Sequence, residues 1–408
     1  MNSFLRVAVA AGIIFTLSGC TKTLTVSNNS DASRQSIGFN AFTHLTKASA
    51  IVEEAGAHGE NFKMEAFQMS DLAEGSGVTA TPYFSNAFGY NINTAFPMAW
   101  NTQTTQYWPA TTVTDPITSS TATESLSFFS YGPTPAGSEF SIAFNNNNYD
   151  GAQNRTLPKL TVSVAAANAD QKDILAAMTE FKTWTTGSTV SIAYNHILSA
   201  ITFSAKTESD EFKFVVDEII VGVVNNDKAT GSLYPTGVYE FERNNTKGSW
   251  SGQNGSKACY DVALGSAIDI TKDATTSAPI QLNANTGILM LIPQKLNTTD
   301  AEAYFYVKYK SYKEIESGVY ETTPTEFTKF APLYTENMTE WNAGKKYNYV
   351  LNLSDINRKV IEYNVTVNNW EDWDATTPTA DVEIDFQNEV SSNSLPVFEE
   401  GTEFETSW

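Results

Sequence analysis

Apolar and polar side chains alternate at every second position over much of the chain. Five short segments follow this pattern: Phe62–Ala66, Phe140–Phe144, Leu160–Val164, Val190–Tyr194 and Ile201–Phe203. A period of two places the apolar side chains on one face of a β-strand, so each segment is predicted to form a strand with one buried face. Clusters of Gly, Asn, Asp, Thr and Pro separate the segments and favour turns.

The second half contains longer strand-like segments. Phe212–Val224 is a continuous apolar and β-branched run, which is typical of a strand covered on both faces. Two further segments each put four apolar residues on one strand face: Tyr347, Tyr349, Leu351 and Leu353 in the first, and Ile361, Tyr363, Val365 and Val367 in the second. These strands predict an all-β, sandwich-like architecture.

One stretch departs from the period of two. Asp170–Phe181 carries Ile174, Leu175, Met178 and Phe181 at the spacing of one helix face, so it is predicted to be a helix. The Thr and Gly-rich segment Thr185–Ser188 follows it and is typical of a linker. We therefore expect a domain boundary between about residues 183 and 188, with a body of comparable size on either side.

The first twenty residues have the pattern of a secretory signal. Arg6 gives a positive start, and Val7–Leu17 is an apolar run too short to span a bilayer as a helix. Ser18, Gly19 and Cys20 then resemble a bacterial lipobox, in which the cysteine is diacylated and becomes the first residue of the mature protein. The alternative is an ordinary signal peptide that contains a cysteine. A covalent lipid on Cys20 would anchor the chain to a membrane and leave Cys259 without a disulfide partner.

Composition and charge narrow the classes of function. The 408 residues include 25 Lys and Arg against 46 Asp and Glu, a formal charge of −21, which excludes electrostatic binding of nucleic acid. The three histidines, His44, His58 and His196, stand at spacings that fit no zinc motif, and we expect no metal and no cofactor besides the lipid. His196 is interpreted as a half-buried strand residue.

Two groups of tryptophans are compatible with sugar binding. Glu371 and Asp372 lie between Trp370 and Trp373, as in a glycosidase site, although a strand end whose indoles cover a core edge is favoured. Trp100 and Trp108 would form either a sugar platform or loop anchors, and the anchor is favoured. No nucleophile elbow, phosphate loop or dinucleotide fingerprint occurs in the sequence. The chemistry therefore favours binding or assembly over catalysis.

The order of several short motifs carries a resemblance to a known family. After the lipobox these are Ile37–Asn40, Thr46–Ala48, Phe62–Phe67, Tyr107–Pro109, Leu126–Tyr131, Asp173–Ala177, Val190–Phe203, Ile288–Gln294, Trp341–Tyr349 and Val365–Trp370. The series resembles the fimbrillin family of lipoprotein pilins and pilus-associated proteins of Gram-negative anaerobes. It covers about residues 1–375 of the chain.

The resemblance implies a fold and a mode of assembly. Fimbrillins have two tandem transthyretin-like Greek-key β-sandwiches and are exported as lipoproteins to the outer membrane. A trypsin-like protease removes an N-terminal strand, and a strand from a neighbouring subunit then fills the apolar groove left behind. Here the removable strand corresponds to Ile37–Phe42, and the cut falls between Lys47 and Ala48, with Arg34 as the less favoured site. Because the family is cut after Arg, either the protease accepts Lys or this subunit stays uncut as an anchor or accessory protein.

The C-terminus contains a candidate donor segment, meaning a segment that one subunit inserts into the next. No Lys or Arg follows Lys359, and Asp381–Trp408 carries eight acidic residues. Val382, Ile384, Phe386 and Val390 share one strand face. The alternative is a solvated acidic tail. The expected organisation is a signal peptide (residues 1–19), a lipidated tether (20–36), an N-terminal sandwich (37–185), a C-terminal sandwich (186–375) and an acidic tail or donor segment (376–408).

The function expected from these features is a cell-surface lipoprotein that forms a structural or accessory part of a fimbria and supports adhesion without catalysis. Its expected partners are other pilin subunits, a membrane through the lipid, and a host or bacterial surface ligand. The alternative is a glycan-binding surface lipoprotein of a nutrient-uptake system. A glycoside hydrolase is the third and least favoured hypothesis.

Overall fold

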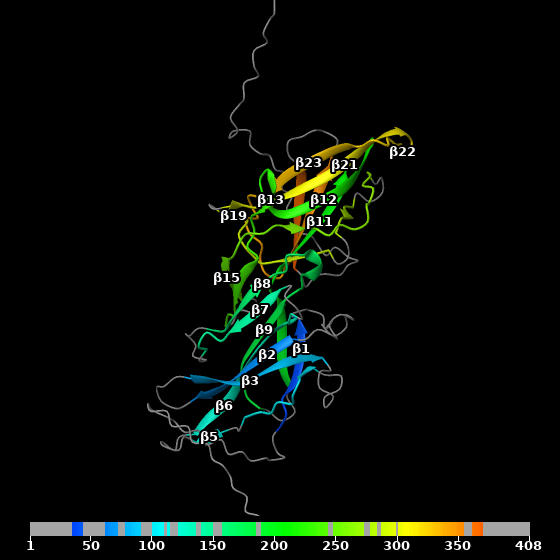
Figure 1. The fold of residues 1–408 in the computed structure, drawn as a ribbon. Helices are drawn as coiled ribbons and strands as arrows, with labels where there is room; N and C mark the ends of the chain where they lie inside the picture. Colours follow the sequence, from blue (N-terminus) through cyan, green and yellow to red (C-terminus); the bar gives the residue numbers. More distant parts are fainter. Residues whose placement is uncertain are drawn as a thin grey trace, which may run out of the picture.

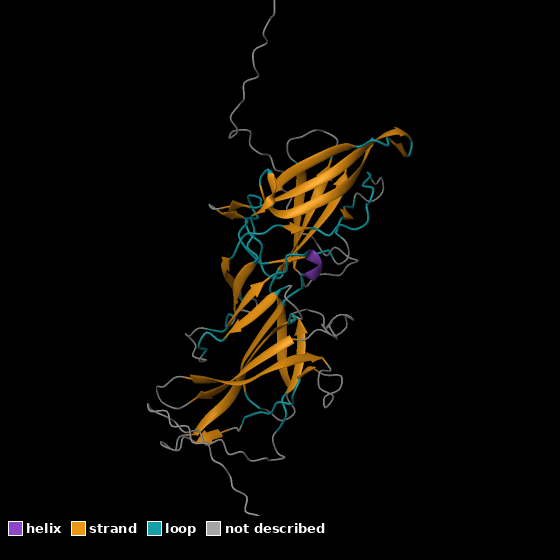
Figure 2. Ribbon diagram, viewed as in Figure 1, coloured by secondary structure: helices purple, strands orange, loops and turns teal. Residues whose placement is uncertain are grey.

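The computed structural model describes residues 35–43, 62–71, 78–90, 100–109, 112–114, 121–135, 140–149, 157–184, 189–243, 248–272, 278–283, 287–298, 301–354 and 361–369. Strands β1 to β25 make up almost all of its regular structure, and one short 3-10 helix, η2 (Asn168–Asp170), accompanies them (Figure 2). The expectation of an all-β chain is therefore confirmed. The molecule is elongated, with one body of strands at each end and further strands and loops between them (Figure 1).

A ring of seven paired strands forms the first body. Around the ring the strands are β2 (Phe62–Asp71), β3 (Val78–Tyr90), β4 (Trp100–Thr102), β1 (Gly38–Thr43), β10 (Thr189–His196), β9 (Leu175–Lys182) and β6 (Thr121–Gly132). The ring closes because β6 pairs with β2 over eight residue pairs as well as with β9. The short strand β5 (Thr112–Thr114) extends the sheet by pairing with the first residues of β6. We call this ring the closed sheet.

Alternating apolar side chains fill the interior of the closed sheet. The buried members of this cluster come from the seven strands and from the segments that flank β1 and β4: Ile37, Phe39, Ala41, Phe62, Met64, Ala66, Phe88, Trp100, Trp108, Leu126, Phe128, Leu175, Ala177, Val190, Ile192 and Tyr194. Aromatic rings dominate this core, and aromatic residues bury large apolar areas.

A four-stranded sheet covers one outer face of the closed sheet. Its order is β15 (Ser249–Asn254), β14 (Thr236–Glu240), β8 (Lys159–Ser163) and β7 (Ser141–Asn145). Phe129 of the closed sheet meets Phe144 of β7 and Phe241 beyond β14, with ring centroids 6.2 and 5.3 Å apart. The strands β14 and β15 lie after the predicted boundary near residue 185 in the sequence, so this sheet takes strands from both sides of that boundary.

The second body is a sandwich of two sheets. One sheet has the order β17 (Ile280–Gln281), β11 (Ser199–Thr207), β24 (Lys345–Leu353) and β25 (Glu362–Asn369), with β18 (Leu289–Leu291) also paired to β11. The other has the order β13 (Asp227–Gly231), β12 (Phe212–Val224), β21 (Tyr304–Glu316) and β22 (Val319–Tyr320), with β16 (Tyr260–Asp261) on β12 and β23 (Thr325–Pro332) on β21. A separate hairpin joins β19 (Asn297–Thr298) to β20 (Ala301–Glu302). Phe305 packs between the two sheets, edge-on to Phe203 and Tyr363.

The two bodies join where β10 continues into β11. The amide of Ile197 donates a hydrogen bond of 3.0 Å to the Ile174 carbonyl, and the indole Nε1 of Trp250 donates one of 2.7 Å to the Ile197 carbonyl. From the second body, the amide of Gly344 donates to the Leu198 carbonyl at 2.9 Å. Gly344 has a φ of +67°, which favours glycine. One buried apolar cluster runs from the four-stranded sheet through this junction into the second body.

An ion pair also ties the four-stranded sheet to the closed sheet. Nε of Arg243, just beyond β14, lies 3.1 Å from Oε2 of Glu180 in β9, and only 16% and 11% of these two side chains are exposed. The hydroxyl of Tyr149 donates to the same carboxylate at 2.6 Å. Charged contacts thus hold the four-stranded sheet on the closed sheet, while backbone and apolar contacts join the two bodies.

The helix predicted over Asp170–Phe181 is wrong. Leu175–Lys182 is strand β9, and its first residues are buried on both faces. Leu175 and Ala177 point into the closed sheet, whereas Ala176 joins the cluster under the four-stranded sheet. Neighbouring apolar residues there reflect a strand covered on both sides and not one face of a helix. Residues 185–188 lie outside the described residues, and the division of the chain into two domains stays a prediction.

Candidate functional site

Strand β1 is the element that the fimbrillin resemblance singles out, and it is part of the closed sheet. It pairs in parallel with β10 over six residues, from Gly38–Thr189 to Thr43–Tyr194. On its other side the register with β4 is the antiparallel pair Phe39–Trp100. Within the described residues, β1 is therefore held strongly on one side and weakly on the other.

The side chains of β1 alternate between the interior and the solvent. Ile37, Phe39 and Ala41 are at most 5% exposed, while Asn40 between them is exposed. The ring of Phe39 meets Phe88 and Phe128 edge-on, with centroids 5.2 and 5.6 Å apart. Such edge-to-face pairs add to the free energy of burying the rings. Phe39 thus lies at the centre of the aromatic core.

The residues before β1 extend this pairing. The Ile37 amide donates to the Gln106 carbonyl at 2.8 Å, and the Trp108 amide donates to the Gln35 carbonyl at 3.0 Å. A bridge between Ser36 and Tyr107 lies between these two bonds. The segment Gln35–Thr43 consequently spans the gap between β10 and the residues that follow β4.

Taking β1 away would leave two unsatisfied edges. The backbone groups of β10 that now bind β1 would be unpaired, and unpaired strand edges bind other strands readily. The apolar side chains around Phe39 would at the same time face water, which is costly in proportion to their area. The geometry therefore describes a slot that needs a strand with alternating apolar residues.

A buried carboxyl lies at one end of the closed sheet's interior. Glu124 of β6 is 6% exposed and accepts a hydrogen bond from the Gln68 side chain of β2. Burial raises the pKa of Glu124 above its ordinary value, and the hydrogen bond from Gln68 offsets this only in part. Deeper inside, the hydroxyls of Ser130 and Tyr194 are hydrogen-bonded to each other.

The structure decides between the interpretations of the two described tryptophans. Trp100 and Trp108 are 4% and 6% exposed and belong to the interior of the closed sheet. Neither indole is available as a surface platform for sugar, so the hypothesis of a platform is wrong and that of an anchor is confirmed. The sequence pattern could not separate the two, because prolines flank exposed and buried tryptophans alike.

His196 ends strand β10 as a half-buried residue, as expected. Its Nδ1 lies 2.7 Å from Oδ2 of Asp173, which precedes β9, so this contact lies within the first body. No group of three or more metal-binding side chains comes together within the part of the chain that the structure describes. Nor does any helix among those residues have the length and apolarity needed to cross a membrane.

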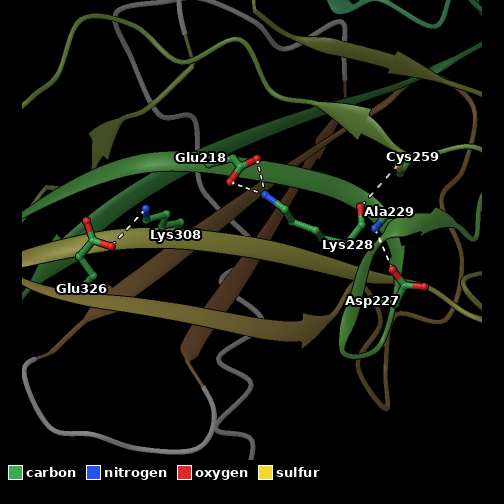
Figure 3. A network of polar contacts seen from close by, with 7 residues as sticks. All are labelled: Glu218, Asp227, Lys228, Ala229, Cys259, Lys308 and Glu326. Atoms are coloured by element: carbon green, nitrogen blue, oxygen red, sulfur yellow. Dashed lines mark hydrogen bonds and ion pairs between the residues drawn. The ribbon is translucent and has the colours of Figure 1, made fainter.

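Cys259 lies on the outer face of the second body, within a network of polar contacts (Figure 3). Its Sγ is 4.0 Å from the Lys228 carbonyl oxygen, and Nζ of Lys228 contacts both carboxylate oxygens of Glu218 at 2.9 and 3.0 Å. Burial and the nearby Asp261 carboxylate raise the pKa of the Cys259 thiol. A raised pKa disfavours the reactive thiolate.

The remaining candidate residues lie outside the described residues. They are the lipid attachment site Cys20, the cleavage candidates Arg34, Lys47 and Ala48, the donor positions Val382, Ile384, Phe386 and Val390, and the acidic pair Glu371 and Asp372.

The sequence does not reveal which aromatic rings contact Phe39. Phe88 lies outside the family motifs and Phe128 lies within the motif Leu126–Tyr131, but only the closed pairing of the sheet brings both rings to Phe39.

A closed sheet completed by strand β1, followed by a sandwich, defines an elongated all-β protein. The model of the fimbrillin-like family matches residues 57–370. The chain therefore belongs to the fimbrillin-like family, and the resemblance inferred from the motifs is confirmed.

One solved structure supports the fold, and others are similar to a lower degree. A fimbrial protein from Bacteroides vulgatus is 18% identical, with a TM-score of 0.58 over 82% of this chain and 99% of that one. A candidate cell adhesion protein from Bacteroides uniformis is 12% identical, with a TM-score of 0.42 over 83% of this chain and 99% of the other. A search of curated proteins finds no match.

Replacing Phe39 by Ala should strongly destabilise the closed sheet. The change removes a buried ring from the centre of the aromatic core, and such changes cost about 3–5 kcal/mol. Urea unfolding followed by tryptophan fluorescence measures the loss. Asn40→Ala, at the exposed neighbouring position of β1, should cost less than about 0.5 kcal/mol. Equal costs for the two variants would contradict the central position of Phe39.

Glu124 should make the protein less stable as pH rises. Because folding raises its pKa, the folded state holds the proton more tightly, and the free energy of unfolding falls from about pH 4.3, the ordinary pKa of Glu, through the raised pKa. In Glu124→Gln this part of the fall should disappear in urea titrations across pH.

Glu240 offers a control of opposite sign. The Lys159 ammonium, 2.9 Å away, lowers the pKa of the Glu240 carboxyl. Its contribution to stability is present above the ordinary pKa of Glu and is lost as pH falls through the lowered one. Glu240→Gln should therefore lose stability relative to the wild type at neutral pH. Parallel pH curves for wild type and Glu124→Gln would rule out the effect assigned to Glu124.

Proposed function

We propose that this chain is a cell-surface lipoprotein and a fimbrial subunit that assembles by strand addition. The observation that carries the proposal is the position of β1, which fills the aromatic interior of the closed sheet but is the N-terminal strand of the described chain. Membership of the fimbrillin-like family supports a role in fimbriae. A structural part in a fimbria requires no catalytic group.

The position of the candidate cleavage site fits this proposal. Lys47 and Ala48 follow the end of β1 at Thr43 by a few residues, so a cut there would separate β1 from the body that it completes. A cut at Arg34 would leave β1 attached. Of the two candidates, Lys47 is therefore the one that can create an acceptor slot beside β10.

The candidate donor segment has the pattern that this slot requires. Val382, Ile384 and Phe386 alternate with acidic residues, just as Ile37, Phe39 and Ala41 alternate with Gly38 and Asn40 in β1. A strand with this pattern can present apolar side chains to the interior and keep its charges in solvent. We propose that this segment of one copy replaces β1 of the next.

The assembly proposal predicts which variants form fimbriae. In producing cells, polymers sheared from the surface should contain chains that begin at Ala48, as shown by N-terminal sequencing. Lys47→Ala should leave monomers that keep β1, because the slot never opens. Deletion of residues 381–408 should also abolish polymers, because no donor remains.

Arg34→Ala is the matched control, and it should polymerise like the wild type. Wild-type polymers whose chains still begin at Cys20 would contradict cleavage. Polymers of normal length from the variant without residues 381–408 would contradict the donor. A chain that is never cut but stays bound to polymers of other subunits would act as an anchor or accessory protein instead.

The proposed lipid makes a separate prediction. Cys20→Ala should abolish incorporation of labelled palmitate and release the chain from the membrane fraction, since the acyl chains are its anchor. Ser18→Ala keeps a small residue before the cysteine and should retain the label. Label on Cys20→Ala at the wild-type level would show that the lipid is elsewhere.

A further inference from the structure

A cavity of about 470 Å³ lies beside the junction between the two bodies. Strand β15 contributes Trp250 and Gln253 to its lining, the segment before β14 contributes Tyr234, and the turn before β24 contributes Trp341 and Asn342. The volume falls within the range of about 300–1,000 Å³ that is typical of small-molecule sites. Two half-buried aromatic side chains, Tyr234 and Trp250, and three amides, Gln253, Gln294 and Asn342, thus line one cavity, with the buried Trp341 behind them.

The aromatic walls are held in place by contacts outside the cavity. Besides its hydrogen bond to Ile197, the indole of Trp250 lies 5.8 Å from the ring of Tyr239 in an edge-on arrangement. Nε1 of Trp341 donates to the hydroxyl of Tyr349 at 3.0 Å. Both indole N–H groups are therefore engaged by the fold, and the rings are fixed before any ligand arrives. Such preorganisation lowers the entropic cost of binding.

The polar part of the lining is close to electrically neutral. It contains one cation, Lys295, and one anion, Glu340, both exposed at the rim, beside neutral amide and hydroxyl groups such as Asn342 and Ser249. This balance differs from the strong negative charge of the whole chain. A second ammonium, that of Lys257, lies beside the lining, with its Nζ 5.1 Å from the ring centroid of Tyr234. The lining itself carries no net positive charge to attract phosphate, sulfate and other strongly anionic ligands.

We propose that this cavity binds a neutral carbohydrate. The apolar C–H faces of a pyranose ring pack against aromatic side chains, and its hydroxyls exchange hydrogen bonds with amides, hydroxyls and a carboxylate. Tyr234, Trp250, Gln253, Glu340 and Asn342 offer this combination in one place. The site lies away from the slot of β1, so it adds ligand binding to the assembly proposed above and does not depend on it.

An array of neutral hexose and N-acetylhexosamine oligosaccharides, with sialylated and sulfated counterparts, tests the proposal on the full chain without its signal peptide. The strongest neutral ligand is then titrated by calorimetry. Trp250→Ala should weaken binding by about tenfold through loss of the aromatic wall. Asn342→Ala, at an exposed position, should weaken it about threefold through loss of one hydrogen bond.

Trp184→Ala is the matched control, since Trp184 is an exposed tryptophan outside the cavity. It should bind like the wild type. Circular dichroism establishes whether each variant is folded. If Trp250→Ala does not fold, Asn342→Ala provides the test. Failure to bind any neutral glycan would overturn the proposal. So would binding of anionic glycans alone, or unchanged affinity in the folded variants.

Discussion

The closed sheet can exclude water from its aromatic interior only while a strand lies between β10 and β4. This constraint governs the first body, because Phe39 supplies the ring that Phe88 and Phe128 contact. The interior has no covalent reinforcement within the described residues, where Cys259 is a free thiol. Strand pairing and apolar burial therefore decide together whether this body is closed.

The second body does not share this dependence. Its two sheets bury Phe203, Phe305 and Tyr349 between them, all from strands later in the sequence than β1. At the junction, the Trp250 indole, the Gly344 amide and a continuous apolar cluster connect the two bodies. The packing of the second body thus does not depend on the strand that lies beside β10.

Much of the fold could be predicted from the sequence, because alternation is a local signal. The segments around Phe62, Val190 and Tyr347 all form the strands that their periodicity indicates. The failure at β9 has a physical cause: Leu175, Ala176 and Ala177 are apolar in succession because sheets cover both of their faces. A period read from one chain cannot distinguish a strand buried on both faces from a helix buried on one.

The candidate sites also differ in whether a local signal in the sequence could reveal them. The strand near the N-terminus, and its position between Arg34 and Lys47, could be predicted from the order of the motifs in the sequence. The cavity was not, because Tyr234, Trp250 and Trp341 are far apart in the sequence and no spacing joins them. For Trp100 and Trp108 the sequence left a sugar platform and a favoured anchor open, and only the closed sheet shows that both lie inside.

The continuous path from β10 to β11 has a mechanical consequence. Only Ile197 and Leu198 separate the two strands, and each strand has a parallel neighbour, β1 beside β10 and β24 beside β11. A pull along this path would load the hydrogen bonds of both parallel ladders in shear, so that many bonds must yield together and not one after another. The strand that occupies the slot beside β10 would then share the tension carried through the subunit.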